Sequence, residues 1–403
     1  MNLARRLILM LVLTSAVVAG AVTFNYLLNP YGAWRTALIN PIFRKVEHER
    51  VVTPYLLRTA GPETILLGSS RVLMGMRIEQ GERAGVMNAA LTAATIDQLS
   101  RIVSVALESR RLRRIVWGVD FFSLNTGWDK RDPNFDARMS GSVRAKVEDT
   151  LLSSSVLGDG YDYARRAMRG QRRLPATMTA DLPWPMALIC EQFGATKNHG
   201  LQVTPTAEIE DELAHDLPDY AAYRQSPEFI RRLRETVDAA RARGVQVVMF
   251  VPPMSEYELE LIRQSGQWEK FQEFKRELAQ IGPYWDFSGY NAMARTDEFF
   301  MHVMHFKIAV GQLMLRMILG AGAQPCNEAA QIVIGSAVRV DIANVAAEVA
   351  RQDMLREDAA RTESRYSRLV AEAIAHRARD RIKQAAGDTG QDESRSAAMA
   401  ATR

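Results

Sequence analysis

Cysteine is scarce in this chain, which has two cysteines, Cys190 and Cys326, among 403 residues. So few cysteines exclude a scaffold built from several disulfides and a cysteine-rich zinc module. The two thiols either pair, if the protein is exported, or remain free. The sequence alone leaves both states open, because pairing depends on the distance and direction between the two side chains.

A large charge of one sign is also missing. Lys and Arg together number 51 against 47 Asp and Glu, which gives a formal net charge of +4. No block of basic residues with interleaved aromatics accompanies this small excess, so a dedicated nucleic-acid binder is not expected. The composition, 47% hydrophobic and 24% charged, is ordinary for a folded protein and excludes a wholly disordered or collagen-like chain.

One long hydrophobic run, from Leu7 to Leu28, follows Arg5 and Arg6. A helix needs about 20 mostly apolar residues to cross a bilayer, and basic residues favour the cytoplasmic side. The run therefore predicts a single-pass membrane anchor over residues 1–30, with the main domain extracytoplasmic, in the periplasm. A cleaved signal peptide is the alternative, since Ala19–Ala21 is an acceptable cleavage site. We favour the anchor because the apolar character continues past that site.

Short apolar runs alternate with helical patterns through residues 31–322, which we interpret as one α/β domain. Such alternation is typical of βαβ units and predicts a mostly parallel sheet. The predicted strands are residues 63–67, 86–89, 115–119, 245–251 and 284–287, and the predicted helices are residues 95–107, 226–244, 267–281 and 306–319.

Two regions depart from this alternation. Residues from about 125 to 225 are rich in Arg, Gly, Pro and Asp without a sustained period, which predicts an insertion in the α/β domain. Residues 323–403 form a predicted helical, partly disordered tail, with a composition typical of disorder from Gly387. Helical spacing in the tail is carried by Val338, Ile342, Val345 and Val349.

The clearest candidates for catalytic residues are the serines of Gly68–Ser70, after the first predicted strand, and His305, near the end of the α/β region. A serine at a strand-to-helix turn presents its hydroxyl beside backbone N–H groups that stabilise developing negative charge. A histidine from a distant segment can take the serine proton. Gly-Ser-Ser alone is common in turns, so its position in the chain is what makes it a candidate.

Several short motifs follow one another in a fixed order across residues 30–320. They are Ile65–Arg71, Val86–Thr95, Val116–Asp120, Phe250–Pro253 and His305–Lys307 with Gly311. Together with the N-terminal anchor, they resemble the SGNH (GDSL-like) hydrolase superfamily. Within it, they resemble the membrane-anchored, exported branch that includes the alginate O-acetylation proteins and the D-alanyl-lipoteichoic acid transfer protein. The resemblance implies a three-layer α/β/α, flavodoxin-like domain that uses no cofactor.

By this resemblance, Ser70 is the nucleophile and His305 the general base. The backbone N–H groups of Ser70 and Ala93 would face the oxyanion. Supporting roles are expected for Asp120, His302, Asn88 and Arg71.

The chain also departs from the family pattern. The family usually has an acidic residue three positions before the catalytic histidine, where this chain has His302. Asp120 stands where classical members have an asparagine oxyanion donor, and an ionised Asp only accepts hydrogen bonds. Ala93 replaces the usual glycine. In serine proteases, loss of the orienting acid costs about 10⁴ in kcat, while about 10³–10⁴ over water survives without a full triad.

Besides an exported assembly partner that acts through its tail, the sequence supports two interpretations of function. The first is acyl-ester chemistry, by an O-acyltransferase or esterase, on a cell-envelope polysaccharide, with an integral-membrane acyl donor protein as a further partner. The second is a catalytically inactive scaffold of the same fold, or a polysaccharide-binding module in envelope glycan assembly. A metal site is not expected, because His302 and His305 have no third ligand marked nearby.

Overall fold

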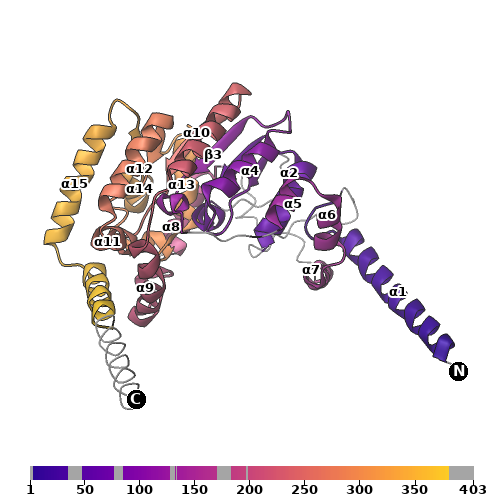
Figure 1. Ribbon diagram of the computed structural model, residues 1–403. Coiled ribbons are helices and arrows are strands. Elements are labelled where there is room, and N and C mark those ends of the chain that lie inside the picture. The colour runs from indigo at the N-terminus through magenta and orange to yellow at the C-terminus, as the bar shows by residue number, and fades with distance from the viewer. Residues whose placement is uncertain are drawn as a thin grey trace, which may run out of the picture.

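The computed structural model describes residues 3–34, 48–76, 85–127, 132, 134–169, 183–196 and 198–380. It is a mixed α/β structure with a mostly parallel six-stranded sheet (Figure 1). The strands are β1 (Thr64–Leu67), β2 (Val86–Asn88), β3 (Arg114–Gly118), β4 (Gln246–Val251), β5 (Tyr284–Asp286) and β8 (Val338–Val340). The predicted α/β alternation and parallel sheet are therefore confirmed.

The strand order in the sheet is β2-β1-β3-β4-β5-β8. The first five strands are parallel, and β8 runs antiparallel to β5. The central strands are short apolar runs that are buried on both sides, as expected for a parallel sheet. The direction of strand addition reverses at β1 and β3, and ligands of open α/β sheets bind beyond the carboxyl ends of the strands at such a point.

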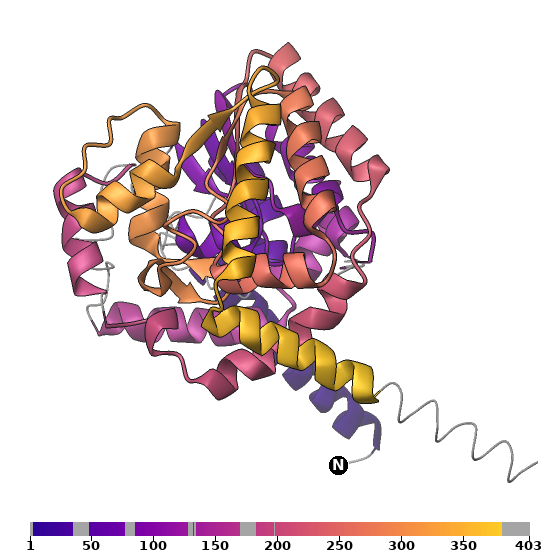
Figure 2. The ribbon, with the colours of Figure 1, turned by 90° about the vertical axis from the view of Figure 1, so that its left-hand side faces the viewer.

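Helices cover the sheet in two groups, and Figure 2 shows strands between them. One group contains α4 (Ile96–Ala106), α10 (Pro227–Ala242) and α12 (Trp268–Ile281), and the other contains α3 (Ser70–Gly75), α8 (Met186–Ala195), α13 (Ile308–Ile318) and α14 (Glu328–Ser336). The N-terminal ends of two of these helices are fixed by capping residues. Thr95 and Gln98 form a capping box at α4, and Ser226 caps α10 with Pro227 in its first turn.

The predicted insertion is more regular than its sequence suggests. In its described parts it forms α5 (Phe135–Met139), α6 (Val143–Thr150), α7 (Ser154–Met168), α8 and α9 (Thr206–Ala221). The helical spacing of apolar residues is weak here, because several of these helices bury only a narrow side and the other positions are polar or charged. The apolar positions of α9, for example, are Ile209, Leu213 and Leu217 at a spacing of four.

The C-terminal region corrects one expectation. The spacing from Val338 onward predicts helix, but Val338–Val340 is strand β8, paired with β5, and helix begins only with α15 (Val345–Arg361). Val338 and Val340 flank the exposed Arg339, a period of two that suits an edge strand. Part of the predicted tail thus completes the sheet. The disorder predicted from Gly387 lies outside the described residues.

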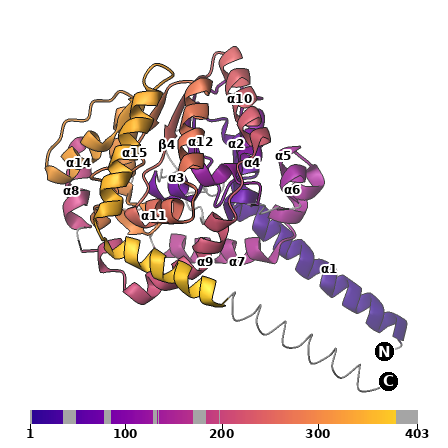
Figure 3. The same ribbon diagram turned by 60° about the vertical axis from the view of Figure 1, so that its left-hand side comes forward.

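The N-terminal helix α1 (Leu3–Leu28) projects away from the rest of the protein (Figures 1 and 3). An 18-residue stretch of α1 has a mean hydropathy of 2.4, and the helix is long and apolar enough to cross a membrane, properties that an N-terminal signal sequence shares. Within the described residues it is the only helix that meets these criteria.

Candidate functional site

Ser70 lies where β1 turns sharply into α3. Gly68 has φ 153°, and a Cβ there would collide with the side chain of Val72. A Cβ at Gly118, on the neighbouring β3, would collide with Val72 too. Ser69 caps α3 by accepting a hydrogen bond from the backbone N–H of Arg71 at 3.2 Å. Two glycines and a capping serine thus place Ser70 at the carboxyl edge of the central strands.

His305 reaches Ser70 from the other end of the domain. It lies in a hairpin of β6 (Phe300–His302) and β7 (His305–Phe306), and its Nε2 is 2.9 Å from Ser70 Oγ. Phe306 packs against Gly75, and Gly311 faces the carbonyl oxygen of Gly75 so closely that no Cβ fits at either glycine. This close approach of α13 and the hairpin to α3 brings the predicted nucleophile and base together.

The His305 ring lies in an environment that disfavours its charged form. Burial lowers its pKa to about 4, and the positive charges of Arg71 and His302 act in the same direction. Among the described residues, no carboxylate forms an ion pair with this ring, whose hydrogen-bond partner is Ser70. His305 is therefore neutral at pH 7 and free to accept a proton, but its imidazolium form receives no carboxylate stabilisation.

His302 lies three residues before His305. Its Nε2 lies 3.3 Å from Glu212 Oε1 on α9, and both side chains are about 40% exposed. The ring centroids of His302 and His305 are 5.8 Å apart. The exposed ion pair contributes little to stability, but it shows that the inserted helix α9 reaches the histidine side of the site.

Arg71 lies in a buried charged network behind Ser70. Its guanidinium is 2.6 Å from Glu258 Oε1, on α11 (Glu256–Gln264), and 3.3 Å from Asp120 Oδ1. Tyr220 donates its hydroxyl to the same Glu258 oxygen at 2.7 Å. Burial lowers the pKa of Arg71, but the negative charges of Glu258 and Asp120 raise it by more than burial lowers it, so the guanidinium stays charged.

Asp120 follows β3 and is 4% exposed. Burial raises its pKa, although Arg71 acts to lower it. The sequence identified Asp120 and Arg71 but not Glu258 or Tyr220. A glutamate inside a short amphipathic helix gives no signal that it is buried, and only the fold shows that it faces an arginine.

Of the two remaining predicted residues, Asn88 ends β2 and Ala93 lies on the loop that follows it. Ala93 lines the cavity beside Ser70 and has φ 48°, a left-handed conformation that favours glycine. The loop is held against the nucleophile turn by a 3.0 Å hydrogen bond from the N–H of Leu91 to the carbonyl of Gly68. Asn88 donates its amide to carbonyls of Val72 and Met76, each at 3.1 Å. Asn88 therefore fixes α3.

A cavity of about 210 Å³ opens beside the serine and histidine. Its lining includes the predicted residues Ser70, Arg71, Ala93, Asp120, His302 and His305. One wall is the acidic side of α9, formed by Glu212, Asp216 and Asp219. Burial raises the pKa of Asp216 to about 7, even though Tyr257 donates a hydrogen bond to it at 3.0 Å. The spacing 212, 216, 219 was the only sequence signal for this wall.

Two further features bear on chemistry. Within the described ranges, no group of three or more His, Cys, Asp or Glu side chains is arranged to hold a metal ion. Cys190 and Cys326 form a disulfide between α8 and the segment before α14. Both α8 and α14 pack on α13. The disulfide therefore links two segments that lie beside the helix that follows His305.

Neither a family model nor a curated protein matches the chain. The chemistry of the site is therefore argued from its geometry, and the likeness of the motifs to the SGNH superfamily stays a resemblance.

Proposed function

We propose that this protein performs acyl-ester chemistry on a cell-envelope polysaccharide, as an O-acyltransferase or esterase of SGNH-like, three-layer fold. The observation that carries the proposal is the 2.9 Å contact between Ser70 Oγ and His305 Nε2, made by residues 235 positions apart. A serine and a neutral histidine in hydrogen-bond contact beside a cavity are the components of nucleophilic acyl transfer.

The reaction proceeds in two halves. Ser70 Oγ attacks the ester carbonyl and passes its proton to His305 Nε2. The tetrahedral intermediate then expels the alcohol, which takes that proton, and an acyl-Ser70 enzyme remains. A sugar hydroxyl or water next attacks the acyl group and gives its proton to His305, which returns it to Ser70. The backbone N–H groups of Ser70 and Ala93 are the proposed oxyanion donors.

The surroundings of the site support a small acyl group and an exported location. The cavity of about 210 Å³ is smaller than the 300–1,000 Å³ of sites for drug-sized ligands, so it suits a short acyl chain. The Cys190–Cys326 disulfide is stable in an oxidising compartment, which favours a domain outside the cytoplasm, held by α1. A membrane protein that delivers the acyl group is the proposed partner.

The experiment is covalent labelling of the full-length protein with a serine-directed fluorophosphonate, followed by mass spectrometry of the peptide. We expect one adduct on Ser70, lost in Ser70→Ala together with ester turnover. Ser123→Ala is the matched control, because Ser123 lines the same cavity but donates its hydroxyl to the carbonyl of Asp120. Undiminished labelling of Ser70→Ala would refute the assignment.

The alternative, a catalytically inactive scaffold or glycan-binding module, is favoured by one observation. Burial lowers the pKa of His305 to about 4, and no carboxylate in the described ranges forms an ion pair with its ring. An active triad normally stabilises the imidazolium with such a group. This alternative predicts that the wild-type protein takes no fluorophosphonate label while it still binds envelope glycans.

A further inference from the structure

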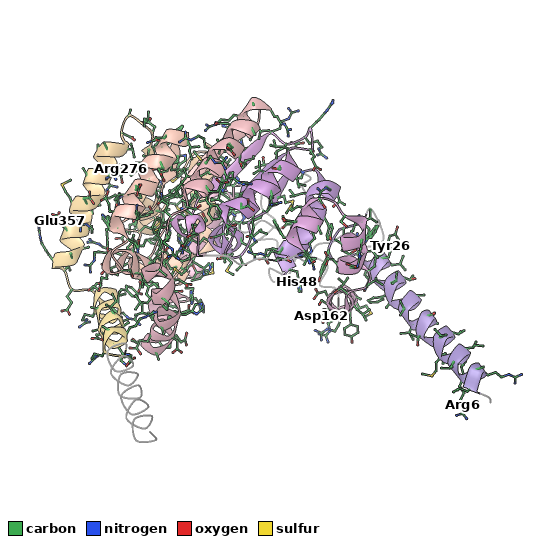
Figure 4. All side chains as sticks on the ribbon, viewed as in Figure 1. Arg6, Tyr26, His48, Asp162, Arg276 and Glu357 are labelled. Atoms are coloured by element: carbon green, nitrogen blue, oxygen red, sulfur yellow. A yellow bond between two sulfur atoms is a disulfide. The ribbon has the colours of Figure 1, made fainter. Side chains whose placement is uncertain are left out.

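Helix α7 packs across the end of α1, so the two helices form one unit. Gly160 of α7 faces α1 so closely that a Cβ there would lie 3.1 Å from Phe24 and 3.2 Å from Leu28. Asn25 is 1% exposed and donates its amide to the carbonyl of Leu151 at 2.9 Å. The end of α1 is thus fixed to the domain beside α7. Figure 4 shows Tyr26 and Asp162 close to this junction and Arg6 at the far end of α1.

The length of α1 sets the level at which α7 lies. A hydrocarbon core about 30 Å thick takes about 20 helical residues. If the core begins after Arg6, it ends near Tyr26, within the turn of α1 that contacts α7. A bilayer crossed by α1 therefore has its surface at the level of α7.

The outer side of α7 is apolar where a soluble protein would be polar. Leu157 is 39% exposed, Tyr161 62% and Met168 80%, and they lie along one side of the helix. An adjacent side, with Val156 and Gly160, is buried. Five of the eight large hydrophobic side chains that are exposed outside α1, among the described residues, belong to α6, α7 and the turn between them: Val143, Leu152, Leu157, Tyr161 and Met168.

Charge at the end of α7 fits the same surface. Arg165 and Arg169 are exposed on the last turns of the helix region, among the apolar residues. Arginines at this depth extend to lipid phosphates, and tyrosine is enriched at the level of the headgroups. A helix with an apolar side and basic residues on its polar side is the usual form of an interfacial membrane helix.

We infer that α7 is a membrane-interface helix. It lies in the surface of the leaflet next to the domain, with Leu157, Tyr161 and Met168 in the acyl boundary and Arg165 and Arg169 on anionic lipid phosphates. Together with α1 it gives the domain two attachments to the bilayer, and so a fixed orientation. This inference does not depend on the chemistry proposed for Ser70.

The test uses the full-length protein in nanodiscs of phosphatidylcholine and phosphatidylglycerol. Tyr161→Cys and Leu157→Cys are labelled separately with a nitroxide while the Cys190–Cys326 disulfide stays oxidised. Met354→Cys is the control, since Met354 is 62% exposed on α15. Collisions with lipid-soluble oxygen and with a water-soluble nickel chelate then give the depth of each label.

We expect both α7 labels about 5–10 Å below the headgroup boundary and the Met354 label in water. Nickel accessibility at both α7 positions equal to that at Met354 would overturn the inference. Exclusion of both reagents would overturn it as well, because it would identify a protein partner on this face. Isolation of the protein with α1 removed by signal-peptide cleavage would also contradict the inference.

Discussion

Ser70 and His305 share one hydrogen bond but lie in regions with different local support. The serine turn is fixed by Gly68 and Gly118, by the capping Ser69 and by the buried Arg71 behind it. The histidine lies in a two-stranded hairpin, and its ring has Ser70 as its hydrogen-bond partner. The serine side is therefore rigidly supported, whereas in the described part of the chain no carboxylate pairs with His305 to stabilise its charged state.

If the proposed acyl-ester chemistry holds, this difference predicts a modest rate. Positioning of the nucleophile and base is complete. Stabilisation of the imidazolium, which the orienting acid supplies in serine proteases, is missing. Each prediction below starts from a substitution on one side of the site.

The largest expected effect comes from removing the base. His305→Gln keeps a polar side chain but cannot take the Ser70 proton, so the rate of fluorophosphonate labelling should fall by about 10²–10⁴. Stopped or quenched labelling time courses measure it. A labelling rate equal to that of the wild type would show that the histidine side contributes nothing to the chemistry.

Next comes the support of the serine side. Arg71→Met leaves Glu258 and Asp120 as buried carboxylates without their positively charged partner, which should lower the free energy of unfolding by about 3–5 kcal/mol. Arg231→Met is the matched control, because Arg231 pairs with Glu228 and Glu235 on an exposed helix surface, and such pairs contribute about 0–1 kcal/mol. Urea unfolding of the two variants measures the difference. Equal losses would contradict the buried network.

A smaller effect is expected from repairing the histidine side. His302→Asp places a carboxylate three residues before His305, which should raise the pKa of His305 and the labelling rate. We expect at least a tenfold gain, out of the roughly 10⁴ that an orienting acid provides in serine proteases. His302→Asn is the control that removes the imidazole without adding a negative charge. Equal rates in the two variants would show that the missing acid is not the limitation.

The sequence predicted the serine side better than the histidine side, and the reason is physical. A buried strand, two glycines and a serine cap are local features with short-range signals, so Ser70 and the strands beside it could be found from Thr64–Ser70 and Arg114–Asp120. His305 was found by its place in the order of motifs. The environment of His305 depends on α9 and α11, whose acidic residues look like ordinary solvent-exposed charges in the sequence.

The fold shows the same limit. The parallel strands and the helices that cover them follow from periodicity, but β8 was missed because three residues, Val338–Val340, carry no strand signal without β5 beside them. The helices of the insertion were missed because their buried sides are narrow. Pairing of Cys190 with Cys326 required knowing that α8 and the segment before α14 lie against the same helix.

The most direct test of the account is the pH dependence of the labelling rate at Ser70. The base is the neutral form of His305, whose pKa is lowered to about 4 by burial and two neighbouring positive charges. The rate should therefore be nearly constant from pH 6 to 8 and fall to half its maximum near pH 4. A midpoint at or above 6.5, the ordinary value for histidine, or a label on another residue, would contradict the account.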